Sequence, residues 1–471
     1  MKKIFLVLAL AMFGASCVQN FNEVSVAADS SVQGGLTQEQ RAKKIVIDML
    51  HRVDPQTRGY VRQIASVDFI SYEQLMGSRT RTESDSTDTD GLKFNPNPIR
   101  NDGFHLINFA DSTGYAIVGQ IRDDLEMFDP DADDDSGAVG LLAMTDSGSI
   151  TTEEILSYGD EWMNGGNTGG GNNGNSGGYN GTEDGELLIG GCNPEQYLIY
   201  LAVNYINRCY QQDGTYIERT PSNATGFFQR GPLLQTVWTQ GNPFNKYFPE
   251  FAGATPQANE KVELQVAGCT TIAVAQIITY LKDISLEEHF EITNSTWNDL
   301  EDATFSKYDD PDKLNVHSDN VAKMIKQIAD DIGVIYQTEV NQTSGTVKKV
   351  KTCLNNYGYS VVKKGEKRLS ARVEDIVSYL NRNKPVFMSG HGNGSGHAWV
   401  LDGYMQNTES NSGDTDSYYL HCNFGWRGNS NGWYFMGLFN SEDNDDTMLD
   451  DENIEDKRFC YDDEFAFIMI D

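Results

Sequence analysis

The chain has 471 residues, of which 39% are apolar and 22% charged, so it is long enough for two or three domains and has the composition of a soluble globular protein. Its 36 basic and 69 acidic residues give a formal net charge of −33. A chain this acidic has no electrostatic reason to bind nucleic acid or an anionic membrane surface, and we therefore expect no nucleic acid as a partner.

The first 17 residues, MKKIFLVLALAMFGASC, predict a signal peptide. Two lysines precede an apolar run over 4–13, which is too short to span a membrane as a helix. The small residues Gly-Ala-Ser before Cys17 resemble a bacterial lipobox, although its first position is usually Leu. We expect export, either as a secreted protein or as an outer-membrane or cell-surface lipoprotein of a bacterium with a lipidated Cys17. The alternative is a plain signal peptide cut near Cys17.

Residues 18–163 predict a small α/β domain. Residues 38–51 are typical of a helix, and two alternating runs within 103–121 surround the turn Asp-Ser-Thr-Gly, as in a β-hairpin. Residues 137–144 predict a further strand, and the polar stretch 80–91 predicts a mobile loop.

Residues 164–190 predict a linker, because 164–181 consist largely of glycine and asparagine and offer almost no apolar side chain to bury. Such a segment is accessible to proteases, and it marks the clearest domain boundary in the chain.

Residues 191–471 predict the larger domain, with helices first and strands later. Helices are expected over 194–210, 317–333 and 346–358; in the second of these, Ser318 is the expected N-cap and Gly333 the end. The expected strands are 384–390, 397–404, 417–426, 432–439 and 464–470. This order predicts the α+β class.

The cysteines and acidic stretches indicate no metal site. The seven cysteines include no CxxC pair, so a zinc or thioredoxin-type site has no support. The acidic stretches 129–137 and 441–456 have no glycine at the sixth position and no terminal glutamate, both of which an EF-hand loop requires. We expect no metal and no organic cofactor.

Cys269 stands at the entrance to a long apolar run, in QVAGCTTIAVAQIITYLK. The run predicts a helix, and backbone N–H groups at a helix N-terminus favour a thiolate, which is the nucleophilic form of cysteine. Gly268 leaves room beside the sulfur. Cys269 is therefore a candidate nucleophile; the alternative is a small core residue that leads into a buried helix.

His397 is the best candidate base among the seven histidines, because a Gly/Ser-rich loop leads it into an apolar strand, GNGSGHAWVLDGY. It lies 128 residues after Cys269, close to the spacing of papain-like peptidases. A positioned imidazole can take the thiol proton and later give it to a leaving amine. Asn423 and Trp426 follow in HCNFGWRG, and either could support the ring; the alternative is an aromatic core hairpin.

Five motifs in order resemble the streptopain family, secreted bacterial cysteine peptidases with a papain-like fold. They are WTQGNPFN, GCTTIAVAQIITY, NVAKMIKQIADDIGV with the TSG and VKKVKTCLNNYGY segments after it, GHAWVLDGY and NFGWRG, and they cover about 230–471. The segment departs from the family pattern at Thr270, Thr271, Phe424 and Arg427. The resemblance implies a papain-like fold, a helical part plus an antiparallel sheet or barrel part, preceded by a small α/β propeptide domain.

Carried over position by position, the resemblance implies that Cys269 is the nucleophile and His397 the general acid and base. Gln240 would help to hold the oxyanion, with Cys269 N–H as the second donor. The resemblance further implies that Ser344 and Gly396 touch the substrate backbone, and it leaves open whether Asn423 or Trp426 supports His397.

The motif INFADSTGYAIVG resembles the propeptide of the same family. The resemblance implies a zymogen, whose own propeptide inhibits a cysteine endopeptidase of broad protein substrates with an apolar residue one position before the cleaved one. Two alternatives remain: another thiol enzyme of the acyltransferase or amidase type, and a non-proteolytic surface binding protein on a peptidase scaffold.

Overall fold

The structure is a computed structural model. The chain consists of two compact units, Met1–Leu36 and Thr37–Asp471, and the fold described below belongs to the second. None of the helices in the described part of the chain is long and apolar enough to cross a membrane. The residues described are 36–53, 62–75, 103–120, 139–163, 182–183, 186–187, 194–210, 227–253, 262–305, 310–366, 372–392, 395–407, 418–439 and 465–471.

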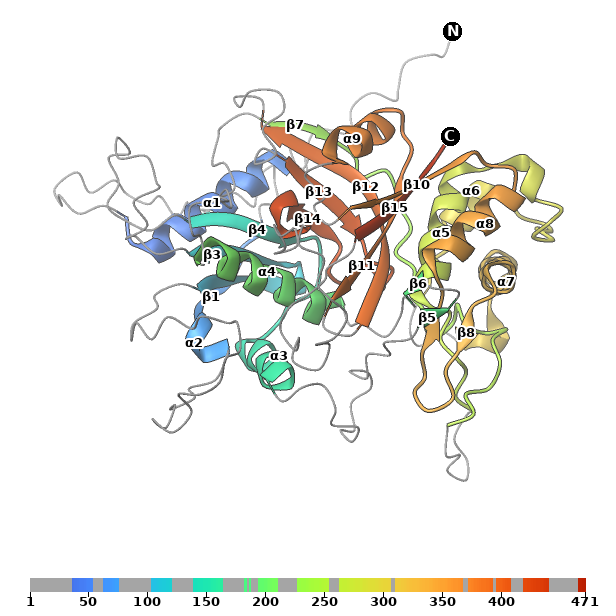
Figure 1. Cartoon of the computed structure of the whole chain (residues 1–471), viewed down its shortest axis with the longest axis horizontal. Coiled ribbons are helices and arrows are strands. Elements are labelled where there is room, and N and C mark those ends of the chain that lie inside the picture. Colours follow the sequence, from blue (N-terminus) through green and yellow to red (C-terminus); the bar gives the residue numbers. More distant parts are fainter. Residues whose placement is uncertain are drawn as a thin grey trace, which may run out of the picture. The chain divides into compact units, whose positions relative to one another are not determined.

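One antiparallel sheet runs through the second unit (Figure 1). Its strands follow the order β1-β2-β3-β4-β14-β13-β12-β11-β15-β10, and β7 pairs with β12. The bounds are β1 Ile64–Ser71, β2 Gly103–Phe109, β3 Tyr115–Gln120, β4 Val139–Thr145, β7 Phe227–Arg230, β10 Val361–Glu366, β11 Val386–Gly392, β12 Ser395–Asn407, β13 Tyr418–Asn423, β14 Gly432–Phe435 and β15 Phe465–Ile470.

The strands before and after the predicted linker meet where β4 pairs with β14. Gly432 lies opposite Thr145 and Trp433 opposite Met144. A Cβ at position 432 would lie 2.2 Å from the Met144 carbonyl oxygen, so glycine lets the two backbones come this close. The boundary at 164–190 stays a prediction; within that range the structure describes the short pair β5 Thr182–Glu183 and β6 Glu186–Leu187.

Helices α1 Gln38–Val53, α2 Tyr72–Leu75, α3 Thr152–Met163 and α4 Pro194–Tyr210 accompany the β1–β4 part of the sheet. In α1 the buried residues Ala42, Val46, Met49 and Leu50 recur at helical spacing and form one apolar face. The predicted helices over 38–51 and 194–210, the hairpin and the strand over 137–144 are confirmed.

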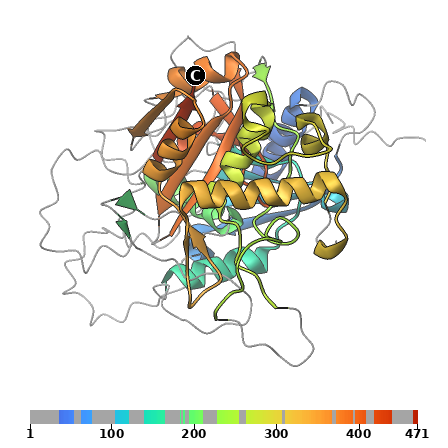
Figure 2. The same ribbon diagram turned by 90° about the vertical axis from the view of Figure 1, so that its right-hand side faces the viewer.

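The other helices include α5 Cys269–Leu281, α6 Trp297–Glu301, α7 Val316–Ile332 and α8 Val347–Asn356, which pack on one another beside β11, β15 and β10 (Figure 1). Figure 2 shows α7 as the long helix that faces the viewer. Helix α9 Val373–Asn381 precedes β11, and β8 Ile335–Tyr336 pairs with β9 Thr343–Ser344. The helices predicted over 317–333 and 346–358, and the five strands from 384 onward, are confirmed; β14 ends in a 3-10 turn over Met436–Phe439.

The predicted cap of α7 is wrong by one turn. Asn315 is the N-cap, and its side chain accepts a hydrogen bond from Ser318 N at 2.9 Å. Ser318 is buried inside the helix instead. Gly333 ends α7 in a left-handed conformation, as the sequence predicts.

Two cores lie on opposite faces of the later strands, because successive strand residues point to opposite sides of a sheet. Ala398 and Val400 belong to the core that includes α5, α7 and α8, whereas Trp399 and Leu401 belong to the core that includes α1 and α4. The α+β class, with a helical part plus an antiparallel sheet part, is therefore confirmed.

Candidate active site

Cys269 is the first residue of α5, one position further into the helix than the sequence suggested. Gly268 is the N-cap with φ 86°, a left-handed value, and a Cβ there would lie 3.0 Å from the Thr343 carbonyl oxygen. Helix α5 is buried on all sides from Cys269 to Thr279. The glycine thus lets the chain turn into the helix with Thr343 packed against it.

The thiol of Cys269 is protonated at neutral pH in this form of the protein. Burial raises its pKa to about 11, while hydrogen bonds from the backbone amides of Ala398, Thr270 and Cys269 itself act in the opposite direction. The sequence predicted a thiolate favoured by the helix N-terminus. The amide contacts are present, but removal of the sulfur from water outweighs them, since only 3% of the residue is exposed.

His397 lies on β12 opposite Gly390 and is also buried. Its Nε2 lies 3.0 Å from the Phe424 carbonyl oxygen, and its ring is stacked with those of Trp399 and Phe424. Burial lowers the pKa of His397 to about 4, and the Phe424 carbonyl opposes this. A carbonyl can only accept, so Nε2 carries the proton and Nδ1 remains an acceptor.

The backbone next to His397 contacts the candidate nucleophile, but the imidazole stacks on rings of the other core. Ala398 belongs with Cys269 to the core around α5, whereas the rings of Trp399 and Phe424, with which His397 stacks, belong to the opposite core. Among the described residues, none of the hydrogen bonds or charge effects recorded for His397 involves Cys269. The backbone next to the predicted base therefore contacts the candidate nucleophile, whereas the imidazole contacts Phe424 and Trp399.

Gln240, the predicted oxyanion residue, lies in the segment beside the start of α5. Its carbonyl oxygen accepts a hydrogen bond from Ala267 N at 2.8 Å, and the residue is partly exposed. Thr239 bridges to Trp426, and Trp238 O accepts from Arg427 N at 2.9 Å. These contacts hold Gln240 near the N-terminus of α5.

The two candidates for support of His397 have other surroundings in this structure. Asn423 Nδ2 donates to Thr236 O at 2.8 Å, and its Oδ1 accepts from Gln276 Nε2 and Gly425 N, each at 3.2 Å. Trp426 Nε1 has no hydrogen-bond partner within the described residues. The group that holds His397 here is the Phe424 carbonyl, which the sequence could not have identified because every residue has one.

Of the two predicted substrate contacts, Gly396 is adjacent to His397 in the sequence, and Ser344 lies in a strand that packs beside the start of α5. Ser344 is buried in β9 between Thr343, which packs on Gly268, and Gly345, where a Cβ would lie 2.7 Å from Thr270 Oγ1. Gly396 precedes His397 on β12 and is paired with His391. Their contact with a substrate stays a prediction.

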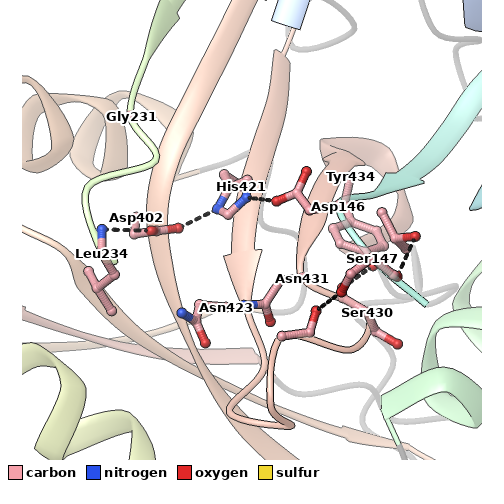
Figure 3. A network of polar contacts seen from close by, with 12 residues as sticks. Asp146, Ser147, Gly231, Leu234, Asp402, His421, Asn423, Ser430, Asn431 and Tyr434 are labelled. Carbon is pink, nitrogen blue, oxygen red and sulfur yellow. Dashed lines mark hydrogen bonds and ion pairs between the residues drawn. The ribbon is translucent and has the colours of Figure 1, made fainter. Parts of the chain in front are cut away.

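A second histidine, His421 on β13, lies between two carboxylates (Figure 3). Its Nδ1 is 2.5 Å from Asp402 Oδ1, and its Nε2 is 2.8 Å from Asp146 Oδ2. Burial alone would lower its pKa, but the charge of Asp402 and the hydrogen bonds to Asp146 and Asp402 outweigh burial and raise the pKa to about 10. His421 is therefore a buried cation held between two carboxylates.

A chain of contacts leads from the segment after β4 to His397. Asp146 N donates to Asn431 O at 2.7 Å, and Asn431 Oδ1 accepts from Phe424 N at 2.9 Å. Phe424 O in turn faces His397 Nε2, and Ser147 Oγ donates to Gly428 O at 2.8 Å. The N-terminal part of the unit thus touches the loop that holds the candidate base.

The remaining predicted features are partly outside the described residues. Cys353 and Cys422 are free and buried, as is Cys269. Within the described residues no three His, Cys, Asp or Glu side chains are grouped as a metal site would require. The following lie outside the described residues: the signal peptide with Cys17, the loop 80–91, most of the linker, the acidic stretches 129–137 and 441–456, Cys192, Cys460 and the side chain of Cys209.

The comparisons with known proteins concern the segment that carries this site. Residues 238–434 match the model of the Peptidase C10 family. Streptopain of Streptococcus pyogenes is 29% identical over 43% of this chain and 54% of streptopain, so the chain spans about half the length of the curated relatives it matches. The Thiol protease/hemagglutinin PrtT of Porphyromonas gingivalis is 24% identical over 47% of this chain and 25% of that protein.

A solved fragment of prointerpain A from Prevotella intermedia superposes with a TM-score of 0.43 at 18% identity, over 78% of this chain and 94% of the fragment. The family assignment rests on the sequence matches and not on this superposition. They confirm the resemblance to the streptopain family, which the motifs from Trp238 onward had indicated.

Proposed function

We propose that this chain is a cysteine endopeptidase that is made as a latent precursor and hydrolyses protein substrates. The observation that carries the proposal is the contact at the sulfur: Cys269 begins the buried helix α5, and the amide of Ala398, the residue after His397, hydrogen bonds to its thiol. The match of 238–434 to a peptidase family supports the same chemistry.

In the proposed mechanism, His397 Nδ1 removes the proton from the Cys269 thiol once its ring faces the sulfur. The sulfur attacks the peptide carbonyl carbon, the C–N bond breaks, and the imidazolium gives its proton to the leaving amine. Water then attacks the acyl-enzyme; His397 takes a proton from that water and returns one to the sulfur as the C–S bond breaks. The Cys269 N–H and the Gln240 side chain would stabilise the oxyanion.

Latency is proposed from the neutral, separated pair and from the contacts of the N-terminal part. Burial raises the pKa of Cys269 and lowers that of His397, and the two rings that stack on His397 belong to a different core from Cys269. The contacts from Asp146 through Asn431 to Phe424 reach the carbonyl that holds His397. Loss of the N-terminal part would release this loop, so that the imidazole could turn toward the thiol.

The processing and location follow as further parts of the proposal. Residues 1–17 would direct export, 18–163 would act as an inhibitory propeptide, and 191–471 would form the peptidase domain. Release would require a cut in the linker 164–190 or between about Cys192 and Pro232. The product would be secreted or, if Cys17 is lipidated, anchored to a bacterial membrane.

The test combines thiol labelling with product analysis. Full-length and linker-cut protein are treated with iodoacetamide across a pH series, and labelled cysteines are mapped by mass spectrometry. In the intact chain the labelling rate of Cys269 should rise about tenfold per pH unit up to about pH 11, because the thiolate fraction does so below the pKa of the thiol. After the cut, Cys269 should react at mildly acidic pH, whereas the buried Cys353 and Cys422 serve as unreactive controls.

Cut protein should cleave an unstructured protein substrate, and Cys269→Ala should reduce the rate by on the order of 10⁶-fold with an unchanged thermal melt. Cross-linked substrate or released ammonia would favour a thiol acyltransferase or amidase instead. Equal labelling of Cys269 in both forms would remove the inhibitory role of 18–163. A Cys269 that stays unreactive after the cut, together with no turnover, would favour a binding protein.

A further inference from the structure

Gln276 is a fully buried amide on the nucleophile helix, about two turns beyond Cys269. An amide side chain has an oxygen that accepts and a nitrogen that donates two hydrogens, and a buried amide without partners is costly. The hydrogen-bond partners of Gln276 therefore indicate which parts of the chain its side chain connects.

Both ends of the Gln276 side chain are bonded to other segments of the chain. Its Oε1 accepts from Thr236 Oγ1 at 3.0 Å and lies 3.5 Å from Trp238 N. Its Nε2 donates to Asn423 Oδ1 at 3.2 Å. One side chain of α5 thus connects the extended segment before Gln240 with the end of β13.

Asn423 closes these contacts into a ring, because its Nδ2 donates to Thr236 O at 2.8 Å. The loop after Asn423 also lies directly on the helix. Gly425 has φ 68°, and a Cβ there would come within 2.8 Å of Ile272 Cγ2. The three segments are therefore fixed to one another by paired polar groups and by close packing.

Each of these three segments carries a different part of the proposed catalytic machinery. Helix α5 begins with Cys269. The segment through Trp238 leads to Gln240, whose carbonyl accepts from Ala267 N. The segment after Asn423 includes Phe424, whose carbonyl faces His397 Nε2.

We propose that Gln276 is a positioning residue for thiol hydrolysis, which sets the placement of the nucleophile helix relative to the oxyanion segment and the loop that holds the histidine. This inference rests on the proposed peptidase function. It also gives Asn423 a role different from direct support of His397, because Asn423 acts here as the partner of Gln276 and Thr236. A displacement of about 1 Å between catalytic groups can lower a rate on the order of 100-fold.

The test compares two changes on the same helix. Gln276→Met keeps the length of the side chain but removes its contacts with all three polar partners, which are Thr236 Oγ1, Trp238 N and Asn423 Oδ1. Thr279→Val is the matched control: Thr279 is buried on α5, and its hydroxyl has no hydrogen-bond partner among the described residues. The full chain is incubated until the wild type reaches constant activity, and kcat, KM and the thermal melt are then measured with a peptide substrate.

Gln276→Met should lower kcat by on the order of 100-fold while KM changes by less than about threefold, and Thr279→Val should stay within about twofold of wild type in both. A folded Gln276→Met protein with wild-type kcat would overturn the inference. So would an equal fall in kcat for both variants, since that would indicate a general sensitivity of the core of α5.

A second variant keeps the test decisive if Gln276→Met does not fold. In Gln276→Glu the carboxyl can accept from Thr236 and Trp238, but only its protonated form can donate to Asn423 Oδ1. The ratio of variant to wild-type kcat should therefore rise as pH falls. A ratio that is constant across pH would contradict a positioning role, because a purely structural effect has no reason to follow that proton.

Failure of the inference and failure of the proposed function are distinguishable. If the wild type never cleaves a peptide, the peptidase proposal falls whatever the variants do. If the wild type cleaves and both Gln276 variants match it, only the positioning role of Gln276 falls.

Discussion

Two histidines on neighbouring strands are both almost fully buried, yet one is neutral and the other is positively charged at neutral pH. His397 on β12 is 1% exposed and His421 on β13 is 3% exposed. Burial lowers the pKa of His397 to about 4, whereas the charge of Asp402 and the hydrogen bonds to Asp146 and Asp402 overcome burial and raise that of His421 to about 10.

The difference shows that the partner, and not the depth of burial, decides whether an imidazole in this fold is charged. The Phe424 carbonyl and two aromatic rings leave His397 neutral with Nδ1 unprotonated, as a base must be. Two carboxylates leave His421 unable to accept a proton at neutral pH. One site is thus suited to move a proton, and the other is suited to hold segments together (Figure 3).

Among changes that test the contrast between the two histidines, His397→Gln is expected to have the largest effect. His397→Gln removes the proposed acid and base, and the rate of peptide hydrolysis should fall by about 10²–10⁴-fold. Its free energy of unfolding should change by no more than about 1 kcal/mol, because the side chain is uncharged and glutamine can still donate to the Phe424 carbonyl. Kinetics and a denaturant titration on the same preparation measure both quantities. If His397→Gln keeps wild-type activity, His397 is not the acid and base, and the proposed difference in role between the two histidines is wrong.

The same change at His421 should produce the reverse pattern. His421→Gln leaves the Asp402 carboxylate, which is 0% exposed, without its cation, and removal of one partner from such a pair costs about 3–5 kcal/mol. The fraction that remains folded should retain the activity of the wild type. A large loss of activity in a stably folded His421→Gln protein would mean that His421 takes part in catalysis after all.

The pH dependence of stability sharpens this contrast. The pKa of His421 is higher in the folded chain than in the unfolded chain, so its contribution is complete below about pH 6.5 and is lost as pH rises toward about 10. The slope is at most about 1.4 kcal/mol per pH unit. His421→Gln should remove this alkaline slope when denaturant titrations are compared across pH. An unchanged slope in that variant would show that the imidazole is not charged in the folded chain.

Local sequence patterns predicted helices and helix ends correctly where the pattern allows only one interpretation. The apolar run after Cys269 became α5, and Gly333 ended α7. The cap of α7 was misplaced because Asn315 and Ser318 are both good capping residues three positions apart, and propensity alone does not choose between them.

The charge states of the two histidines could not be predicted from local patterns. Asp402 lies 19 residues before His421 and Asp146 lies 275 residues before it. Their approach depends on the register of β12 with β13 and on the pairing of β4 with β14. The prediction of a favoured Cys269 thiolate failed for a similar reason. The sequence showed that Cys269 stands at a helix N-terminus, but it did not show the burial that raises the thiol pKa.

The smallest effect is expected at Asp146, and it tests which carboxylate sets the charge of His421. The Asp146 side chain is 36% exposed, so water screens it, whereas Asp402 is fully buried. Asp146→Asn should therefore lower the free energy of unfolding by no more than about 1 kcal/mol and leave the alkaline slope in place, because Asp402 still faces the imidazole.

Ser147→Ala is the matched control for Asp146→Asn. Ser147 lies next in the same segment, and its hydroxyl donates to Gly428 O without contact to His421. If both variants lose the same small amount of stability, the segment contributes through its attachment to the loop rather than through its charge. If Asp146→Asn alone removes the alkaline slope, the exposed carboxylate and not the buried one holds the proton on His421. The contrast between the two histidines would then depend on the N-terminal part of the chain, and loss of that part would change the charge of His421.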